Sequence, residues 1–249
     1  MAQLLREFFE LKDMVESPNA ERVTLLIREP HLRDPRCIQV HKGILFKRWP
    51  RIALHCERIH ADTVDLTAER PGVIKDYVTI LHTGHVSDLR YAPGDSSSMS
   101  NVAKSRYNRL SALYIFCGQS EDTISSKIVF CAILDLFHHK WPDGARYFPG
   151  SDVINNIYGS CLPVEPLRQF LAECYIDFAK DGLVLPEEQY NSEFMKNVLM
   201  GVLTRRDLPK YLSRTINPRE FIEMKEPEMP TTKFTRSGRK ALKRRRASM

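Results

Sequence analysis

The residues best suited to chemistry lie in the run His55-Cys56-Glu57-Arg58-Ile59-His60, where a thiol and an imidazole are four positions apart. On a helix, Cys56 and His60 would share one face and could supply two ligands to a zinc ion. A structural zinc site needs four ligands, and the neighbouring residues His138 and His139 would diverge by about 100° on a helix. We therefore expect no metal site.

The chain also lacks the common motifs of catalytic sites. There is no GxxxxGK[ST] phosphate loop, no GxGxxG after a strand, no HExxH and no GxSxG elbow. Cys117, Cys131 and Cys174 fall on apolar faces of predicted helices, where burial raises the pKa of a thiol and makes it unreactive. His41 follows an apolar strand, as packed and hydrogen-bonded histidines usually do. We expect a protein that is not an enzyme and holds no cofactor.

The composition is that of a soluble globular protein. Of 249 residues, 43% are hydrophobic and 27% are charged. No apolar run approaches the roughly 18 residues that cross a bilayer, so we expect no membrane partner. Four acidic residues among the first sixteen argue against an export signal. Six cysteines lie scattered without a CxxC pair, which indicates reduced, buried thiols and a location in the nucleus, the cytoplasm or both.

Periodicity predicts the elements that would position these side chains. Three β-rich runs precede a series of helical patterns, which indicates an α+β fold. The first two strands should form a hairpin, Pro50 should stop the first helix after them, and Gly84 should close the next one. The expected strands are residues 23–27, 37–41 and 63–66; the expected helices are 42–48, 71–83, 107–117, 123–139, 164–179 and 187–203, with a polar loop insertion at 92–105.

The N-terminal residues 1–18 contain an amphipathic stripe. Its apolar side chains recur at the spacing that places them on one helix face. Such a stripe could dock on a partner or cover the chain's own core, and the sequence leaves both readings open. The candidate interface consists of Leu4, Leu5, Phe8, Leu11 and Val15.

Three short motifs in order resemble the BTB/POZ family. They are Val40-His41-Lys42-Gly43-Ile44-Leu45, the strand Val64-Asp65-Leu66, and Ile80 to Val86 around Thr83-Gly84. The later helices are similar to the C-terminal half of BTB proteins common in filamentous fungi. Arg22 and Arg48-Trp49-Pro50 depart from the family pattern, which has an aspartate and a serine at these places. The family positions are Val40, His41, Lys42, Leu45, Leu66, Leu81, Thr83 and Gly84.

The resemblance implies a domain order and a function. It implies a BTB/POZ-like domain at 19–118, with a short mixed sheet flanked by helical hairpins, and an all-helical extension at 119–205. A mostly disordered basic tail would follow at 206–249. BTB/POZ domains bind proteins, so the resemblance implies a homo- or hetero-oligomer that recruits partners, with a cullin-type ubiquitin ligase among the candidates.

Positive charge is concentrated at the C-terminal end. Residues 231–249 hold eight basic and no acidic side chains, which leaves 29 basic and 31 acidic ones on the rest of the chain. The tail could be a nuclear-import signal of a transcription or chromatin regulator, a non-specific nucleic-acid contact or a solvated tail. Arg245-Arg246-Ala247-Ser248 also fits basophilic kinases, which makes Ser248 a candidate phosphosite. The candidate import cluster is Lys240, Lys243, Arg244, Arg245 and Arg246.

Overall fold

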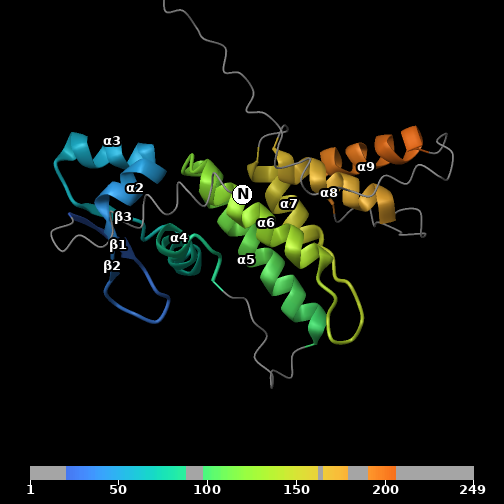
Figure 1. The fold of residues 1–249 in the computed structure, drawn as a ribbon, viewed down its shortest axis with the longest axis horizontal. Helices are drawn as coiled ribbons and strands as arrows, with labels where there is room; N and C mark the ends of the chain where they lie inside the picture. Colours follow the sequence, from blue (N-terminus) through green and yellow to red (C-terminus); the bar gives the residue numbers. More distant parts are fainter. Residues whose placement is uncertain (1–20, 88–97, 162–164, 179–189, 206–249) are drawn as a thin grey trace, which may run out of the picture.

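A computed structural model describes residues 21–87, 98–161, 165–178 and 190–205, which form a mixed α+β fold (Figure 1). The α+β part of the predicted fold class is therefore confirmed. The first described half comprises β1 (Arg22–Ile27), β2 (Arg36–His41), α2 (Lys42–Arg48), α3 (Pro50–Ile59), β3 (Thr63–Asp65) and α4 (Pro71–Thr83). The second half comprises α5 (Met99–Gln119), α6 (Thr123–His138), α7 (Ser151–Ser160), α8 (Pro166–Phe178) and α9 (Ser192–Arg205).

The described sheet has the strand order β2-β1-β3. β1 and β2 form the predicted antiparallel hairpin, in a register that runs from the pair Arg22 and His41 to the pair Ile27 and Arg36. β3 runs parallel to β1. Because successive side chains of a strand alternate between its faces, Val23, Leu25 and Ile27 all lie on one face, where they are fully buried.

The predicted helix at residues 42–48, stopped before Pro50, is confirmed as α2, but the helix that follows it was not predicted. α2 does end at Arg48, but Pro50 is the first residue of α3. A proline fits this position because the first N–H groups of a helix have no intrahelical acceptor and the ring already fixes a helical φ. α3 ends at Ile59, and His60 follows in the left-handed region with φ 50°. Cys56 and His60 therefore do not share a helical face as predicted.

α4 begins and ends where the sequence predicts. Pro71 occupies its first turn, and Gly84 follows at φ 71° with its N–H bonded to the Ile80 carbonyl. This left-handed conformation strains residues that have a Cβ, which explains the glycine. The face directed inward buries Ile74, Tyr77 and Leu81. The helix thus closes the sheet-containing half of the molecule.

α5 begins earlier than the sequence predicts. The small polar residues before it favour a loop through Ser105, but the helix starts at Met99. Ser98 provides the cap, since its hydroxyl oxygen accepts a hydrogen bond from the Asn101 N–H at 3.4 Å. Residues 99–105 of the predicted insertion are therefore helical, and residues 88–97 lie outside the described ranges.

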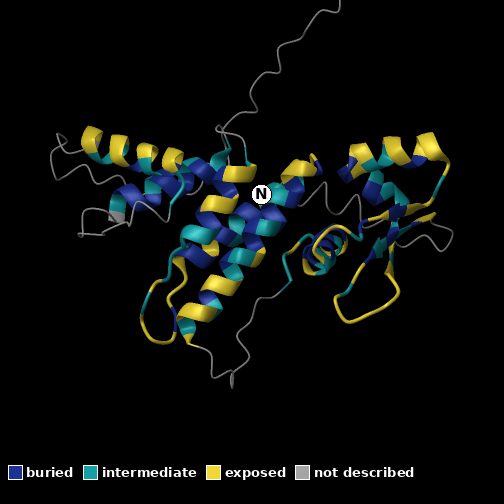
Figure 2. Ribbon diagram, turned by 180° about the vertical axis from the view of Figure 1, so that it is seen from behind, coloured by how far each residue is buried: buried dark blue, intermediate teal, exposed yellow. Residues whose placement is uncertain are grey.

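The helices after α5 form a second core rich in aromatic side chains. The predicted helices at 123–139, 164–179 and 187–203 are confirmed as α6, α8 and α9, with shifted ends. Phe170 meets Phe130 and Phe137 edge to face, with ring centroids 5.8 and 5.2 Å apart. Edge-to-face contacts of this kind stabilise a core beyond the area that they bury. Figure 2 shows the buried stripes of these helices turned toward one another.

A buried ion pair joins the two halves. The Arg48 guanidinium at the end of α2 donates to Asp122 Oδ1 at 2.9 Å, and both side chains are almost completely buried. Asp122 also caps α6 by accepting the Ser125 N–H, and its second oxygen accepts the Tyr77 hydroxyl at 3.1 Å. Arg48 further donates to Ser125 Oγ at 2.7 Å. This network fixes α2 and α4 against the start of α6.

Candidate interaction surface

Most of the residues that carry the BTB/POZ resemblance are buried. Val40, Leu45 and Leu81 are at most 1% exposed, and Leu66 is also buried. Burial of an aliphatic side chain contributes roughly 1.5–3 kcal/mol each, so these four stabilise the fold. None of them can contact a partner directly.

Thr83 and Gly84 shape the end of α4. The Thr83 hydroxyl donates to the Thr79 carbonyl at 2.7 Å and accepts the His85 N–H at 3.2 Å. Together with the left-handed Gly84, these bonds turn the chain away from the helix. The pair has a conformational role and supplies no group for chemistry.

His41 is packed as predicted, but its ring is not hydrogen-bonded. Both ring nitrogens are buried and lack a hydrogen-bond partner in the structure. A buried polar atom without a partner costs free energy, so the ring is held by packing alone.

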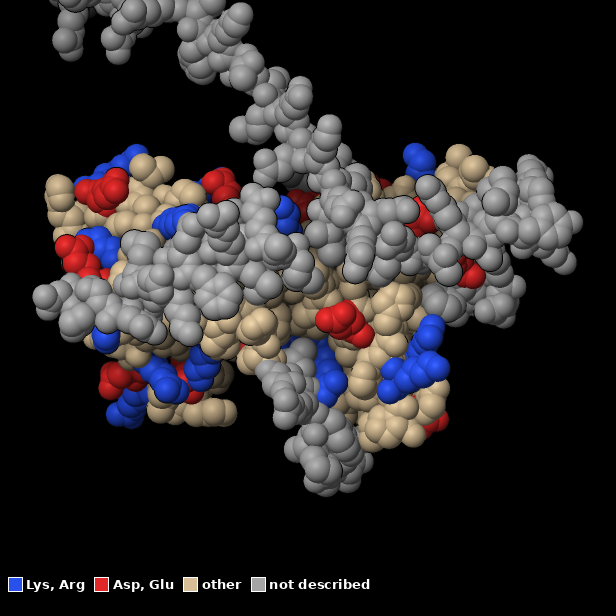
Figure 3. Space-filling model, viewed as in Figure 1, with Lys and Arg blue, Asp and Glu red and all other residues tan. Residues whose placement is uncertain are grey.

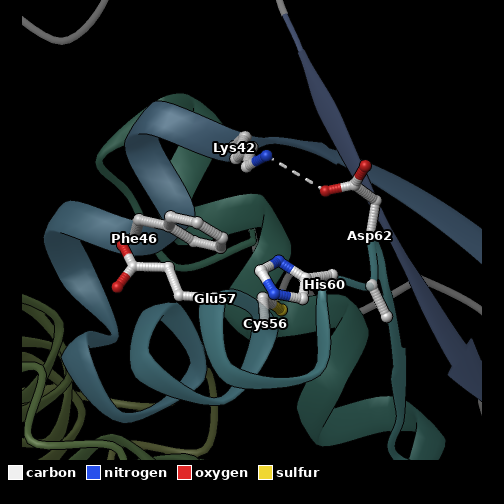
Figure 4. A pocket seen from close by; sticks show the side chains of 7 residues that line it. Lys42, Phe46, Cys56, Glu57, His60 and Asp62 are labelled. Atoms are coloured by element: carbon white, nitrogen blue, oxygen red, sulfur yellow. Dashed lines mark hydrogen bonds and ion pairs between the residues drawn. The ribbon is translucent and has the colours of Figure 1, made fainter.

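Lys42 lies at the edge of a surface hollow of about 440 Å³ between α2, α3 and the start of β3 (Figure 4). Its ammonium group lies 3.1 Å from Asp62 Oδ1 and 2.9 Å from Glu21 Oε2. Hydrogen bonds to these carboxylates raise the pKa of Lys42 to about 12. The hollow is lined by Lys42, Phe46, Cys56, Glu57, His60, Ala61 and Asp62.

Neither the lysine nor the cysteine of this hollow is a ready nucleophile. Lys42 stays protonated at neutral pH, so it has no lone pair for attack on a substrate. Cys56 is buried, and burial raises the pKa of its thiol, which keeps it in the unreactive form. Across the described ranges, no group of three or more histidine, cysteine or acidic side chains is arranged to hold a metal ion.

Two helices expose apolar side chains that the sequence reasoning missed. On α3, Leu54 is 63% and Ile59 is 49% exposed. On α9, Leu199, Met200 and Leu203 are each about half exposed. Figure 2 shows the yellow outer faces of both helices at opposite ends of the molecule. For α3, the apolar residues after Pro50 could have indicated a second helix. They were not interpreted in this way because Pro50 was expected to end the helical segment.

The cysteines divide into two groups. Cys56, Cys117 and Cys174 are buried, Cys131 and Cys161 are half-buried, and burial raises the pKa of each of these five thiols. Cys37 is exposed on β2, so the prediction that all six are buried is wrong for this residue. Its neighbours on the strand alternate between faces, and Cys37 points away from the core.

The remaining predicted site residues lie outside the described ranges. They are the N-terminal stripe at Leu4, Leu5, Phe8, Leu11 and Val15, the basic cluster from Lys240 to Arg246, and Ser248. No helix within the ranges that the structure describes is long and apolar enough to cross a membrane. Comparison with protein-family models, curated proteins and solved structures finds no match to this chain.

Proposed function

We propose that this protein is a BTB/POZ-like module that binds other proteins and has no catalytic activity. The observation that carries the proposal is the exposure of five apolar side chains, Leu54 and Ile59 on α3 and Leu199, Met200 and Leu203 on α9, the last three of which share one helix face. Apolar side chains gathered on a helix face favour burial against a partner.

The order of the elements supports the BTB/POZ part of the proposal. An antiparallel hairpin, two short helices, a strand parallel to the first one and a longer helix follow one another, and the family motifs fall on this series. The motif residues Val40, Leu45 and Leu81 have the buried positions that a shared scaffold requires. From this resemblance we infer that the protein forms a homo- or hetero-oligomer. One function of such an oligomer would be to recruit partners to a cullin-type ligase.

Aspartate substitutions on the two apolar faces test this function. Leu54→Asp with Ile59→Asp changes α3, and Leu199→Asp with Leu203→Asp changes α9. Leu32→Asp is the matched control because Leu32 is 50% exposed in the turn between β1 and β2. Light scattering would give the molar mass of each variant, and affinity capture with quantitative mass spectrometry would give its partners.

We expect at least one face variant to lose self-association or partners that the wild type and Leu32→Asp retain. A wild-type chain that remains at 28.8 kDa and captures the same proteins as all three variants would contradict the proposal.

A second function is favoured by the eight basic and no acidic side chains of residues 231–249. We propose as the alternative a nuclear transcription or chromatin regulator, in which this segment directs import or contacts nucleic acid without sequence preference. Replacement of Lys243, Arg244, Arg245 and Arg246 by glutamine tests it. The alternative requires loss of nuclear fluorescence of a tagged chain or loss of salt-dependent DNA binding.

A further inference from the structure

The outer face of α9 is apolar. Leu199, Met200 and Leu203 are 59%, 56% and 46% exposed, and their spacing places them on one face of the helix. The inner side of α9 is already packed against α8, and it buries Phe194 and Val198. At the upper right, where Figure 1 places α9, Figure 3 shows uncharged atoms beside a few basic ones. An exposed apolar face of this kind favours burial.

The α9 face is small for an interface between two separate molecules. A stable protein–protein interface buries about 800 Å² on each partner, which corresponds to roughly 20–30 residues. The three half-exposed side chains of α9 provide only a fraction of this area. A segment of the same chain needs less area, because a short connection raises its effective concentration to the millimolar range. The size of the face therefore favours an occupant from the same chain.

The chain continues from α9 into a sequence that suits this face. α9 ends at Arg205, and residues 206–249 lie outside the described ranges. The first apolar residues after α9 recur at the spacing that places side chains on one helix face. They are Leu208, Tyr211, Leu212 and Ile216. We name residues 208–216 the return segment.

The residues at both ends of the return segment are typical of helix ends. Asp207 is a favoured helix cap, Pro209 suits a first helical turn, and Pro218 suits the residues just after a helix. Residues 206 and 207 would then be the connection, and two to five residues are enough to turn one helix back along another. Nine helical residues span about 14 Å, whereas Leu199 to Leu203 span about 6 Å of the α9 axis. The return segment is thus long enough to cover the apolar face.

We propose that the return segment docks on α9 of the same chain and covers Leu199, Met200 and Leu203. The apolar side chains of the segment meet those of α9, and its intervening polar residues face the solvent. A protein partner that uses the α9 face has to displace the return segment first. In this respect the inference rests on the proposed function, to which it adds a built-in competitor. It also separates residues 208–216 from the mostly disordered tail that the family resemblance implies.

Thiol labelling of the full chain tests this proposal. Met200→Cys places a thiol on the α9 face, and Leu54→Cys places a control thiol on α3, where Leu54 is 63% exposed. Each variant is made with the native return segment and with a serine segment that carries Tyr211→Ser, Leu212→Ser and Ile216→Ser. Mass spectrometry of peptides gives the maleimide rate at the introduced cysteine.

We expect Met200→Cys to react about tenfold more slowly with the native segment than with the serine segment. An effective concentration of about 1 mM and a dissociation constant of about 0.1 mM would give this protection. Leu54→Cys should react equally fast in both chains, because α3 lies on the other half of the molecule.

Equal rates of Met200→Cys with both segments would overturn the proposal. Phe221→Ser with Ile222→Ser is the matched control farther along the chain, and the same gain in its rate would mean that residues 208–216 are not the occupant. Protection that disappears on dilution would assign the cover to a second copy of the chain. An equal gain at Leu54→Cys would mean that the segment stabilises the whole fold, which also contradicts docking on α9. Partner binding is not measured here, so failure leaves the proposed function standing.

Discussion

At the scale of single residues, the Arg48–Asp122 pair is a buried ion pair that joins the two halves of the described fold. We expect Asp122→Ala to lower the free energy of unfolding by about 3–5 kcal/mol, because it leaves the Arg48 charge buried without its carboxylate. Urea denaturation measures this loss. Arg51→Ala is the control, because it removes an ion pair with Glu121 whose side chains are 68% and 51% exposed and should cost less than about 1 kcal/mol.

A double-mutant cycle distinguishes the ion pair from the other bonds of Asp122. Arg48→Met combined with Asp122→Asn should cost less than the two single changes added together, with a coupling of about 1–3 kcal/mol. Additive losses would mean that the two side chains stabilise the fold independently. Asparagine is chosen because it can still cap α6.

The exposure of the cysteines predicts an order of labelling. At neutral pH, Cys37 should react with a maleimide before the other five, because it is exposed on β2, whereas burial raises the pKa of Cys117 and Cys174 and hides their sulfur atoms. Mass spectrometry of the native protein after brief labelling identifies the modified site. Labelling of Cys117 before Cys37 would mean that the second core opens easily.

Single residues also show the limit of prediction from sequence. Arg48 was recognisable as a departure from the family pattern, and Asp122 as part of a helix start. Their pairing was not predictable, because 74 positions separate them and periodicity describes only neighbours along the chain. The prediction that the His41 ring is hydrogen-bonded was wrong for the same reason. Such bonds depend on which polar groups of distant segments lie next to the ring.

At the scale of elements, the contact between α8 and α9 requires a glycine. A Cβ on Gly201 would lie 2.1 Å from Ile176 Cδ1. We expect Gly201→Ala to destabilise the protein by about 1–3 kcal/mol through this overlap. Thermal denaturation measures the loss. Adding Ile176→Ala should recover part of it, whereas Ile176→Ala alone should destabilise, so a purely additive double variant would contradict this packing.

Helices and strands were predictable where the apolar residues recur at a regular spacing and a capping residue, proline or glycine marks the end of the element. The β1–β2 hairpin, α4 with Pro71 and Gly84, and α6 after Asp122 appear where the residues place them. One helix was missed and one helix start was predicted too late. α3 was missed because a proline that stops one helix can also be the first residue of the next, and the start of α5 was wrong because the polar residues after Ser98 can form a loop or the first turns of a capped helix.

At the scale of the whole molecule, one exposed helix face lies on the sheet-containing half and another lies on the helical half. The Arg48–Asp122 network holds the two halves together between them. The sequence could predict the α+β class and the order of the halves. It could not predict which helix faces remain uncovered, because that depends on how all helices pack against one another. We therefore propose that partners bind through the folded part of the chain.

Affinity purification of two chains after nuclease treatment tests that claim most directly. One is the full chain and the other ends at Glu226, which removes all eight basic residues of the tail. We expect both chains to retain the same protein partners, and Leu54→Asp with Ile59→Asp or Leu199→Asp with Leu203→Asp to remove some of these partners from both chains. Partners that disappear with the tail or with the nuclease, and persist in the face variants, would contradict it.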